Sequence, residues 1–459
     1  MLLAAGQRIH LIGIGGAGLS AIARILLGRG LHVSGSDSRM SEITMALAKE
    51  GARVETGHAA EFVLGADAVL ATSAVPDEHI EVAAARALGI PVYRRRQFMS
   101  ALLAGFDTLA VAGAHGKTTT TAMLTHILRC AGQDPSYIVG GTMGNTGSNA
   151  AVGSGASFII EADEYDNMFL GLSPDLAVVT NIEHDHPDFF ASVADLRAAF
   201  CRFAASLRPA GVLVVCADNA AARELAAARR IQGEPVITYG IADAAADWRA
   251  DDLRFAGLGS QFTVRHAGMI RGQARLGLPG AHNALNALAA LVAARQRGVS
   301  IEQGAEALAG FIGAARRFEL RGERDGIVVI DDYAHHPTAI QANLEAARRS
   351  YPQRQIWAVW QPHTYTRAQR FAADFAKAFD QADRALVTPI YAAREEPIAG
   401  FSSSNLAQAI SGRCPAQYMP TFAAAAAIIR SEARRPAAVC IFSAGDANQI
   451  AELLLGDDA

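Results

Sequence analysis

The chain is 459 residues long, which is more than one hydrophobic core accommodates, because a domain usually takes about 100–200 residues. Charged residues make up 19% of the chain and its net charge is −4, so the sequence lacks the strongly basic character that binding to nucleic acid requires. Its longest apolar runs fall well short of the about 20 residues needed to cross a bilayer, so we expect several globular domains without membrane insertion.

Short apolar or β-branched runs alternate with alanine-rich amphipathic stretches along almost the whole chain. This alternation is typical of parallel sheets covered by helices, so the sequence predicts an α/β fold. Three domains are expected, at residues 1–104, 105–314 and 315–459. The predicted strands lie at 9–14, 32–36, 108–112, 158–160, 176–180, 327–330, 355–359, 384–388 and 438–442, and helices are predicted at 18–28 and 283–297.

A glycine-rich turn joins the first predicted strand to the first predicted helix. It contains Gly13, Gly15, Gly16 and Gly18, so its N–H groups can face a diphosphate without a side chain in the way. Asp37 ends the next strand, where a carboxylate can accept hydrogen bonds from a ribose or a base. The pattern predicts a nucleotide site, with a tight structural turn as the alternative, and it does not say which nucleotide binds.

A second glycine-rich loop follows the strand at 108–112 and reads GAHGKTT from Gly113 to Thr119. Its N–H groups can cradle phosphates, Lys117 can hold the β- and γ-oxygens, and the Thr118 hydroxyl can bind Mg²⁺. The usual phosphate loop also has glycine at the position of Val111, so this loop is a variant. Because the chain has only three lysines, a lysine placed here favours an ATP site over a structural turn.

Two acidic segments follow strands that are predicted to be buried. EADEYD follows the strand at 158–160, and NIEHDH follows the strand at 176–180. The carboxyl ends of parallel strands meet at the same edge of a sheet, so both segments are expected beside the phosphate loop. Because Mg²⁺ prefers carboxylate and phosphate oxygens, the segments are candidates for a metal site, with solvated acidic loops as the alternative.

Taken together, these motifs resemble those of the Mur ligase family over essentially the whole chain. The matching segments are GIGGAGLS, SGSD, AGAHGKTTTT, EADEYD, TNIEHDH, PGAHNALN, RRFE, DDYAHHPT, QPHTYTR and AGD. The resemblance implies a Rossmann-like UDP-binding domain, a central P-loop ATPase domain with a mainly parallel sheet, and a C-terminal Rossmann-like α/β domain. It also implies an amide-forming ligase of peptidoglycan synthesis that uses ATP, Mg²⁺, UDP-N-acetylmuramate and L-alanine.

The resemblance further implies roles for individual residues. The UDP-sugar is expected at Gly13, Gly15, Gly16, Gly18, Asp37 and Ser73. ATP is expected at Gly113, Ala114, His115, Gly116, Lys117, Thr118, Thr119, His282, Asn283, Asn286, Arg317, Asp332 and His335. The metal is expected at Thr118, Glu161 and His186, the amino acid at His363 and Arg367, and catalysis is expected to depend on Lys117, His186 and Arg317. Thr364 stands at a position where arginine is common in the family.

Three other interpretations remain open. A ligase that attaches a whole tripeptide to UDP-N-acetylmuramate during recycling typically has a longer insertion after EADEYD, whereas residues 167–180 form a short segment here. An NAD-dependent oxidoreductase would use the first glycine-rich turn and leave the phosphate loop idle. A nucleotide-switched binding protein would leave most of the ligase motifs unexplained.

The five cysteines are widely spaced and form no C-x-x-C pair. They indicate neither a disulfide framework nor a zinc site. The apolar N-terminus also lacks the basic region and cleavage site of a signal peptide. We therefore expect a cytoplasmic protein, whose oligomeric state the sequence does not predict.

Overall fold

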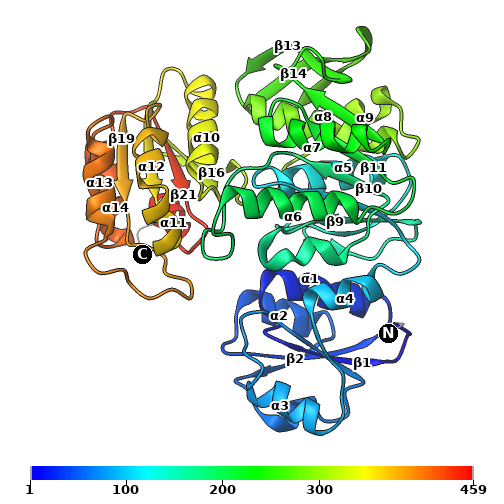
Figure 1. Cartoon of the computed structure of the whole chain (residues 1–459). Helices are drawn as coiled ribbons and strands as arrows, with labels where there is room; N and C mark the ends of the chain where they lie inside the picture. The colour runs from blue at the N-terminus through cyan, green and yellow to red at the C-terminus, as the bar shows by residue number, and fades with distance from the viewer. Residues whose placement is uncertain (1–2, 457–459) are drawn as a thin grey trace.

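The computed structural model describes residues 3–456 as three lobes (Figure 1). The first lobe, blue in Figure 1, comprises β1 (Arg8–Ile12), α1 (Ala17–Gly28), β2 (His32–Asp37), α2 (Glu42–Lys49), β3 (Arg53–Thr56), η1 (Ala60–Val63), β4 (Ala68–Ala71), α3 (Ile80–Ala87), β5 (Val92–Arg94) and α4 (Arg95–Leu102). Its strands form a parallel sheet in the order β3-β2-β1-β4-β5. This strand order places the glycine-rich turn after β1 at the centre of the sheet, where an α/β fold binds ligands.

The central lobe contains the largest sheet. Its elements are β6 (Asp107–Ala112), α5 (Lys117–Cys130), β7 (Ser136–Ile138), β8 (Ala150–Ala151), β9 (Ser157–Glu161), η2 (Tyr165–Gly171), β10 (Leu176–Val179), α6 (Val193–Ala205), β11 (Val212–Cys216), α7 (Ala220–Ile231), β12 (Val236–Gly240), β13 (Trp248–Ala256), β14 (Gly259–His266), β15 (Met269–Leu276), α8 (Ala281–Arg295) and α9 (Ile301–Ala309). The strands run in the order β15-β14-β13-β12-β11-β10-β6-β9-β7-β8. β6 therefore lies between β10 and β9, so the phosphate loop and both acidic segments leave the same edge of the sheet.

The third lobe, yellow to red in Figure 1, lies beside the central lobe. It comprises β16 (Glu319–Arg324), β17 (Ile327–Asp332), α10 (Pro337–Ser350), β18 (Gln355–Trp360), α11 (Tyr365–Arg370), α12 (Ala372–Ala378), β19 (Arg384–Val387), α13 (Ser403–Ser411), β20 (Ala416–Tyr418), α14 (Phe422–Glu432), β21 (Ala437–Phe442) and α15 (Gln449–Leu455). Its sheet has the order β16-β17-β21-β18-β19-β20, parallel except for β16. The predicted three-domain α/β fold is confirmed.

The lobes differ in how their apolar cores are shared. One buried cluster runs from Ile9 and Leu26 in the first lobe to Phe158 and Phe203 in the central lobe. In the third lobe, two clusters cover the opposite faces of the sheet, and their buried members all come from that lobe. The first two lobes are thus joined by apolar packing, whereas the contacts between the third lobe and the central lobe described below are mainly polar.

Two features depart from the sequence-based expectations. β13, β14 and β15 form an antiparallel extension of the central sheet that the sequence analysis did not predict. α5 begins at Lys117 rather than near Thr119, because the loop glycine at 116 already directs the chain into the helix. Within the described residues, no helix is both long enough and apolar enough to cross a membrane.

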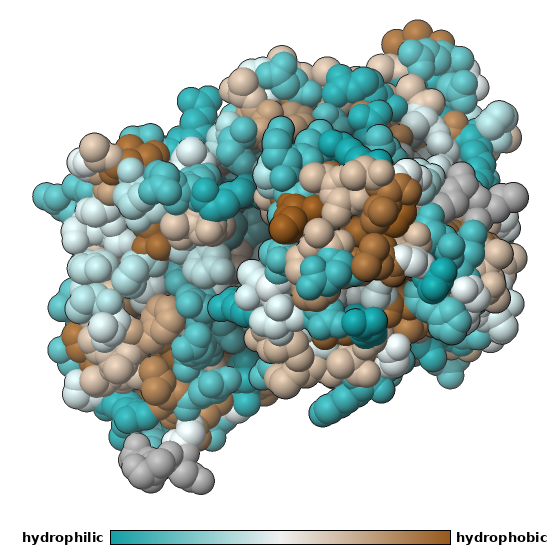
Figure 2. Space-filling view, turned by 90° about the horizontal axis from the view of Figure 1, so that it is seen from below, coloured by the Kyte–Doolittle hydropathy of each residue, from teal (hydrophilic) through white to brown (hydrophobic). Residues whose placement is uncertain are grey.

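Figure 2 views the molecule from below and shows apolar surface gathered on the first lobe, the side on which α3 lies in Figure 1. The large apolar residues of this region are Leu64, Ile80 and Leu88, with exposed fractions of 64%, 51% and 54%. Ile80 is the first residue of α3 and Leu88 is its C-cap, while Glu81, Val82 and Ala85 of the same helix are buried. This exposed surface is separate from the cavity between the lobes, whose lining does not include these residues.

Candidate active site

A cavity of about 530 Å³ lies where the three lobes meet. Four helices begin at its wall: α1 through Ala17 and Gly18, α5 through residues 116–119, α8 through His282 and Asn283, and α10 through His336 and Thr338. Helix N-termini carry partial positive charge and unpaired N–H groups, so each of them favours an anion. Four of them around one cavity predict a ligand, or a pair of ligands, with several negative charges.

The phosphate loop owes its shape to two glycines. Gly113 has φ +137° and lies so close to Thr180 that a Cβ atom would come within 2.0 Å of the Thr180 hydroxyl oxygen. Gly116 has φ +80°, and a Cβ atom there would come within 2.4 Å of the Asn286 side-chain oxygen. Val111 is fully buried in β6, so the chain is still extended where the usual loop would already turn.

Lys117 is held at the first turn of α5 by acceptors from two segments. Its Nζ donates to the Gly113 carbonyl at 2.6 Å and to Glu164 Oε2 at 2.8 Å. Burial alone lowers the pKa of Lys117, but Glu164, Asp163 and Glu161 more than offset this and raise the pKa above its usual value. Lys117 is therefore charged at neutral pH, and a phosphate in the loop would compete with Glu164 for it.

Two sets of potential metal ligands adjoin this lysine. The Thr118 hydroxyl donates to Glu161 Oε1 at 3.1 Å, and the other Glu161 oxygen accepts from the Gly140 N–H. Asp163, Glu164 and His186 form the second set, with one ligand atom from each within 4.8 Å of the others. The structure thus brings the three predicted metal ligands, Thr118, Glu161 and His186, to one wall of the cavity.

The third lobe supplies Arg317, Asp332 and His335 to the lining of the same cavity. Arg317 Nη2 donates to the Thr118 hydroxyl at 2.9 Å, which links the third lobe directly to the phosphate loop. The Asp332 carboxylate accepts from the backbone N–H groups of Phe318 and Ala334, both at 2.7 Å, so it fixes the turn that carries its neighbours. His335 Nε2 lies 3.8 Å from Asp185 Oδ2 of the central lobe.

Arg367 and Asp185 form a buried ion pair between the third lobe and the central lobe, with side chains 4% and 3% exposed. Arg367 Nε donates to Asp185 Oδ1 at 2.7 Å, and its other nitrogens face His363 Nδ1 at 3.0 Å and His186 Nδ1 at 3.3 Å. In this arrangement the guanidinium group expected to bind the amino acid is therefore already engaged with protein groups.

Three histidines of the cavity lining, His282, His335 and His363, are neutral at pH 7. Burial and the Arg367 charge lower the pKa of His335 to about 4, and burial with His335 and Arg367 lowers the pKa of His363 to about 3. Burial also lowers the pKa of His282, at the start of α8, to about 4. Each ring therefore has one nitrogen that can accept a hydrogen bond or a proton. His282 lies beside Asn283 and Asn286 on the cavity wall.

The residues predicted to bind the first nucleotide lie together at the turn after β1. Gly15 N donates to Asp37 Oδ2 at 2.9 Å, and Gly13 has φ +81°. Gly16 is the N-cap of α1, and Ser73 is exposed in the loop that follows β4. Of the predicted set only Gly18 lines the common cavity, so a ligand at this turn would reach the cavity at α1.

Several cavity residues had no assigned role in the sequence analysis. Arg95 lies so close to Gly18 that a Cβ atom there would come within 2.8 Å of the guanidinium carbon. Arg95 Nη1 is 3.9 Å from Asp163 Oδ2, so this arginine joins the α1 turn to the metal segment. The sequence feature that could have indicated a role for Arg95 is the run of three arginines at 94–96, which follows a strand. Asp185, which also lines the cavity, and Glu164, which accepts from Lys117 outside the lining, lie inside the acidic segments, where sequence could not separate buried acids from solvated ones.

Comparisons with known proteins agree with this geometry. Three family models match in order: the Mur ligase family catalytic domain at 8–107, the Mur ligase middle domain at 111–294, and the Mur ligase glutamate ligase domain at 316–445. UDP-N-acetylmuramate–L-alanine ligase of Mycolicibacterium vanbaalenii is 43% identical, covering 98% of this chain and 96% of that one. The same enzyme of Geobacter sp. is 43% identical over 88% and 87% of the two chains.

Two solved structures are similar over nearly the whole length. UDP-N-acetylmuramate–alanine ligase of Thermotoga maritima has a TM-score of 0.83 and 27% identity, covering 98% of both chains. A murein peptide ligase of Psychrobacter arcticus has a TM-score of 0.72 and 27% identity, covering 99% of this chain and 100% of that one.

Proposed function

The chain belongs to the Mur ligase family, and from this membership we propose that it is an ATP-dependent ligase that joins L-alanine to the lactyl carboxylate of UDP-N-acetylmuramate in peptidoglycan precursor synthesis. The observation that carries the proposal is that the α1 turn and the phosphate loop open into the same cavity. A UDP-sugar bound at the first turn would extend its acid toward the terminal phosphate of ATP.

The proposed reaction has two steps. The lactyl carboxylate attacks the γ-phosphorus of ATP, which releases ADP and leaves an acyl phosphate. The amine of L-alanine then attacks the acyl carbon, loses a proton, and releases phosphate as the amide forms. Lys117 and the N-terminus of α5 stabilise the charge on the transferred phosphoryl group, and Arg317 adds a second cation from the third lobe.

The residues at the phosphate loop fit Mg²⁺. Thr118 and Glu161 offer hard oxygen ligands beside the loop, and the adjacent carboxylates of Asp163 and Glu164 with His186 offer a second set. When bound, Mg²⁺ would neutralise phosphate charge. We therefore keep Thr118, Glu161 and His186 as the proposed metal ligands.

Other roles are proposed from position. Gly13, Gly15, Gly16, Gly18, Asp37 and Ser73 would bind the UDP-sugar. Residues 113–119 with His282, Asn283, Asn286, Arg317, Asp332 and His335 would bind ATP, all of them in the cavity lining except Gly113. His363 and Arg367 would address the amino acid, and Arg367 would do so only after exchanging a protein partner for it. Glu395 accepts from the Thr364 hydroxyl at 2.5 Å and so fixes the start of α11 beside His363.

The domain limits and the location remain proposals. We place the boundaries at 104/105, between α4 and β6, and at 314/315, between α9 and β16. A cytoplasmic location fits the proposed substrates, because both nucleotides are cytoplasmic metabolites.

One second candidate follows from the structural comparison. The murein peptide ligase of Psychrobacter arcticus aligns over 99% of the chain, so a peptide, such as the tripeptide of the recycling reaction, is the alternative incoming amine. The short connection from η2 at Gly171 to β10 at Leu176 favours the smaller substrate.

A product assay tests the proposal. The protein is incubated with UDP-N-acetylmuramate, ATP and Mg²⁺, and separately with L-alanine, glycine, L-serine or the tripeptide, and the products are weighed by mass spectrometry. We expect ADP and the alanyl amide in equal amounts with L-alanine. An amide with the tripeptide alone would favour recycling, and ADP without any amide would favour a nucleotide switch. Oxidation of added NADH would support the oxidoreductase interpretation.

Arg317→Ala is expected to lower kcat about 100-fold or more, because the variant loses a cation at the transferred phosphoryl group. The matched control is Arg321→Ala, an arginine of the same lobe outside the cavity lining. The measurement is steady-state ADP release at saturating substrates, with KM for ATP determined in parallel. Unchanged turnover and unchanged KM in Arg317→Ala would contradict a role of the third lobe in catalysis.

A further inference from the structure

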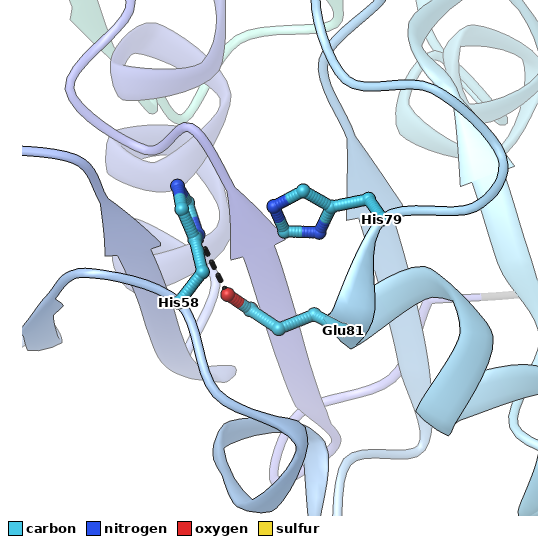
Figure 3. Close-up of side chains that lie close together, drawn as sticks. All are labelled: His58, His79 and Glu81. Atoms are coloured by element: carbon cyan, nitrogen blue, oxygen red, sulfur yellow. Dashed lines mark hydrogen bonds and ion pairs between the residues drawn. The ribbon is translucent and has the colours of Figure 1, made fainter.

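A cluster of two histidines and a glutamate lies in the first lobe, outside the lining of the cavity (Figure 3). His58 follows β3, His79 precedes α3, and Glu81 belongs to the first turn of α3. One nitrogen or oxygen atom from each of the three lies within 4.8 Å of the others. Figure 3 shows the two rings on either side of the Glu81 carboxylate.

Glu81 is fully buried and its carboxylate is held in one orientation. Its Oε2 accepts from the Ser36 hydroxyl at 2.9 Å and lies 2.7 Å from His10 Nε2, and its Oε1 lies 2.7 Å from His58 Nδ1. Burial alone raises the pKa of Glu81, but the bonds to His10 and His58 more than offset this, so the pKa is lowered. A charged carboxylate therefore presents Oε1 to the space between the two rings.

His79 takes no part in the hydrogen bonds that hold Glu81, so these bonds do not explain why a histidine lies here. Its Nδ1 is buried, and no partner for a hydrogen bond is found among residues 3–456. Its ring meets the His58 ring edge to face, with centroids 4.5 Å apart. A neutral imidazole has one ring nitrogen with a lone pair that can bind a metal ion. A bound ion would give this buried nitrogen the partner that it lacks in the described structure.

We propose that His58, His79 and Glu81 bind a divalent cation of the zinc class. Two imidazoles and one carboxylate are a donor set that suits Zn²⁺ and Co²⁺ better than Mg²⁺, with water in the fourth position. His10 and Ser36 supply the outer contacts that orient the glutamate, as partners of metal ligands commonly do. Binding requires the His58–Glu81 hydrogen bond to open, because the metal takes the place of the shared proton.

The test uses the full-length protein, stripped with a chelator and kept in excess Mg²⁺ so that oxygen-rich sites are filled. Zn²⁺ binding is measured by calorimetry, and Co²⁺ binding by the visible absorption of tetrahedral Co²⁺. The diagnostic variant is His79→Asn, because this change breaks no hydrogen bond of the described structure and leaves His10, Ser36 and His58 on Glu81. His186→Asn is the matched control, since it removes an imidazole from the cluster beside the phosphate loop.

We expect His79→Asn to weaken the tight Zn²⁺ site by about 100-fold or more, and His186→Asn to leave that site intact. Zinc anomalous scattering from a soaked crystal should place the ion between the two rings of Figure 3. Equal Zn²⁺ affinity in the wild type and in His79→Asn, or an anomalous peak only beside His186, would overturn the proposal. Neither readout depends on ligase turnover, so the site and the proposed function can fail independently.

Discussion

Lys117→Met is expected to lower ligase turnover about 100- to 1,000-fold at saturating substrates. Removing one preorganised donor from a developing negative charge has a cost of this order, and Lys117 is both charged and fixed at the start of α5. The measurement is ADP release coupled to mass spectrometry of the amide. Lys377→Met is the control, because Lys377 is an exposed lysine of α12 in the third lobe.

The same substitution leaves Glu164 buried without its cation. Breaking a buried pair from one side costs about 3–5 kcal/mol, so Lys117→Met should also unfold at a lower denaturant concentration. Lys117→Met/Glu164→Gln should recover most of that stability and none of the turnover, with Glu164→Gln alone as the reference for the loss of the acid. If the double variant were more active than Glu164→Gln, Lys117 would serve only to neutralise its partner.

Arg367→Leu is expected to separate the third lobe from the central lobe in solution. Asp185 would then be buried without its guanidinium partner in the closed arrangement, at a cost of about 3–5 kcal/mol that opening of the lobes would relieve. Small-angle X-ray scattering should show a larger radius of gyration, and turnover should fall because Arg317 and His335 leave the cavity. Arg370→Leu, an exposed arginine of the same helix, should change neither quantity.

Asp185→Asn/Arg367→Leu should restore the compact form, since the double change leaves no buried charge behind. A compact Arg367→Leu variant would show that other contacts hold the lobes together.

The ion pair between Asp185 and Arg367 also predicts a dependence of stability on pH. Burial alone raises the pKa of Asp185, but Arg367 more than offsets this and the pKa lies well below its usual value of 3.8. The stabilisation of the folded protein by the charged Asp185 carboxylate is therefore complete above about pH 4. It is lost only as the pH falls through the lowered pKa.

The sequence predicted the parallel strands that lead into recognisable motifs, because those signals are local, but it missed others, among them β11 and β12. β6 and α5 are neighbours in the chain, so the loop between them could be recognised with the strand before it and the helix after it. β13, β14 and β15 were missed because polar residues alternate along them and no apolar run marks them, as the sequence TVRHAGMIRGQARL at 263–276 illustrates. Many of their residues are polar because one side of this extension faces solvent, where Met269 and Ile270 are also exposed.

The candidate site could be predicted only where its residues share a motif. Asp185 and Arg367 are 182 positions apart, and neither segment indicates that the two side chains meet. His58, His79 and Glu81 match no metal-binding spacing, because the chain brings them together through β3 and α3 rather than through a short repeat. Spacing alone also could not show that Arg367 is occupied by protein partners.

The apolar cluster shared by the first and central lobes determines which fragments of the chain could be produced separately. A break at 104/105 would strip solvent protection from Phe106 and Phe158, whose rings lie in contact 5.5 Å apart and under the Arg29 guanidinium of the first lobe. Fragments 1–104 and 105–459 would each expose an apolar surface and should aggregate unless they are coexpressed. A break at 314/315 leaves both cores of the third lobe whole, so that piece is the natural candidate for separate production.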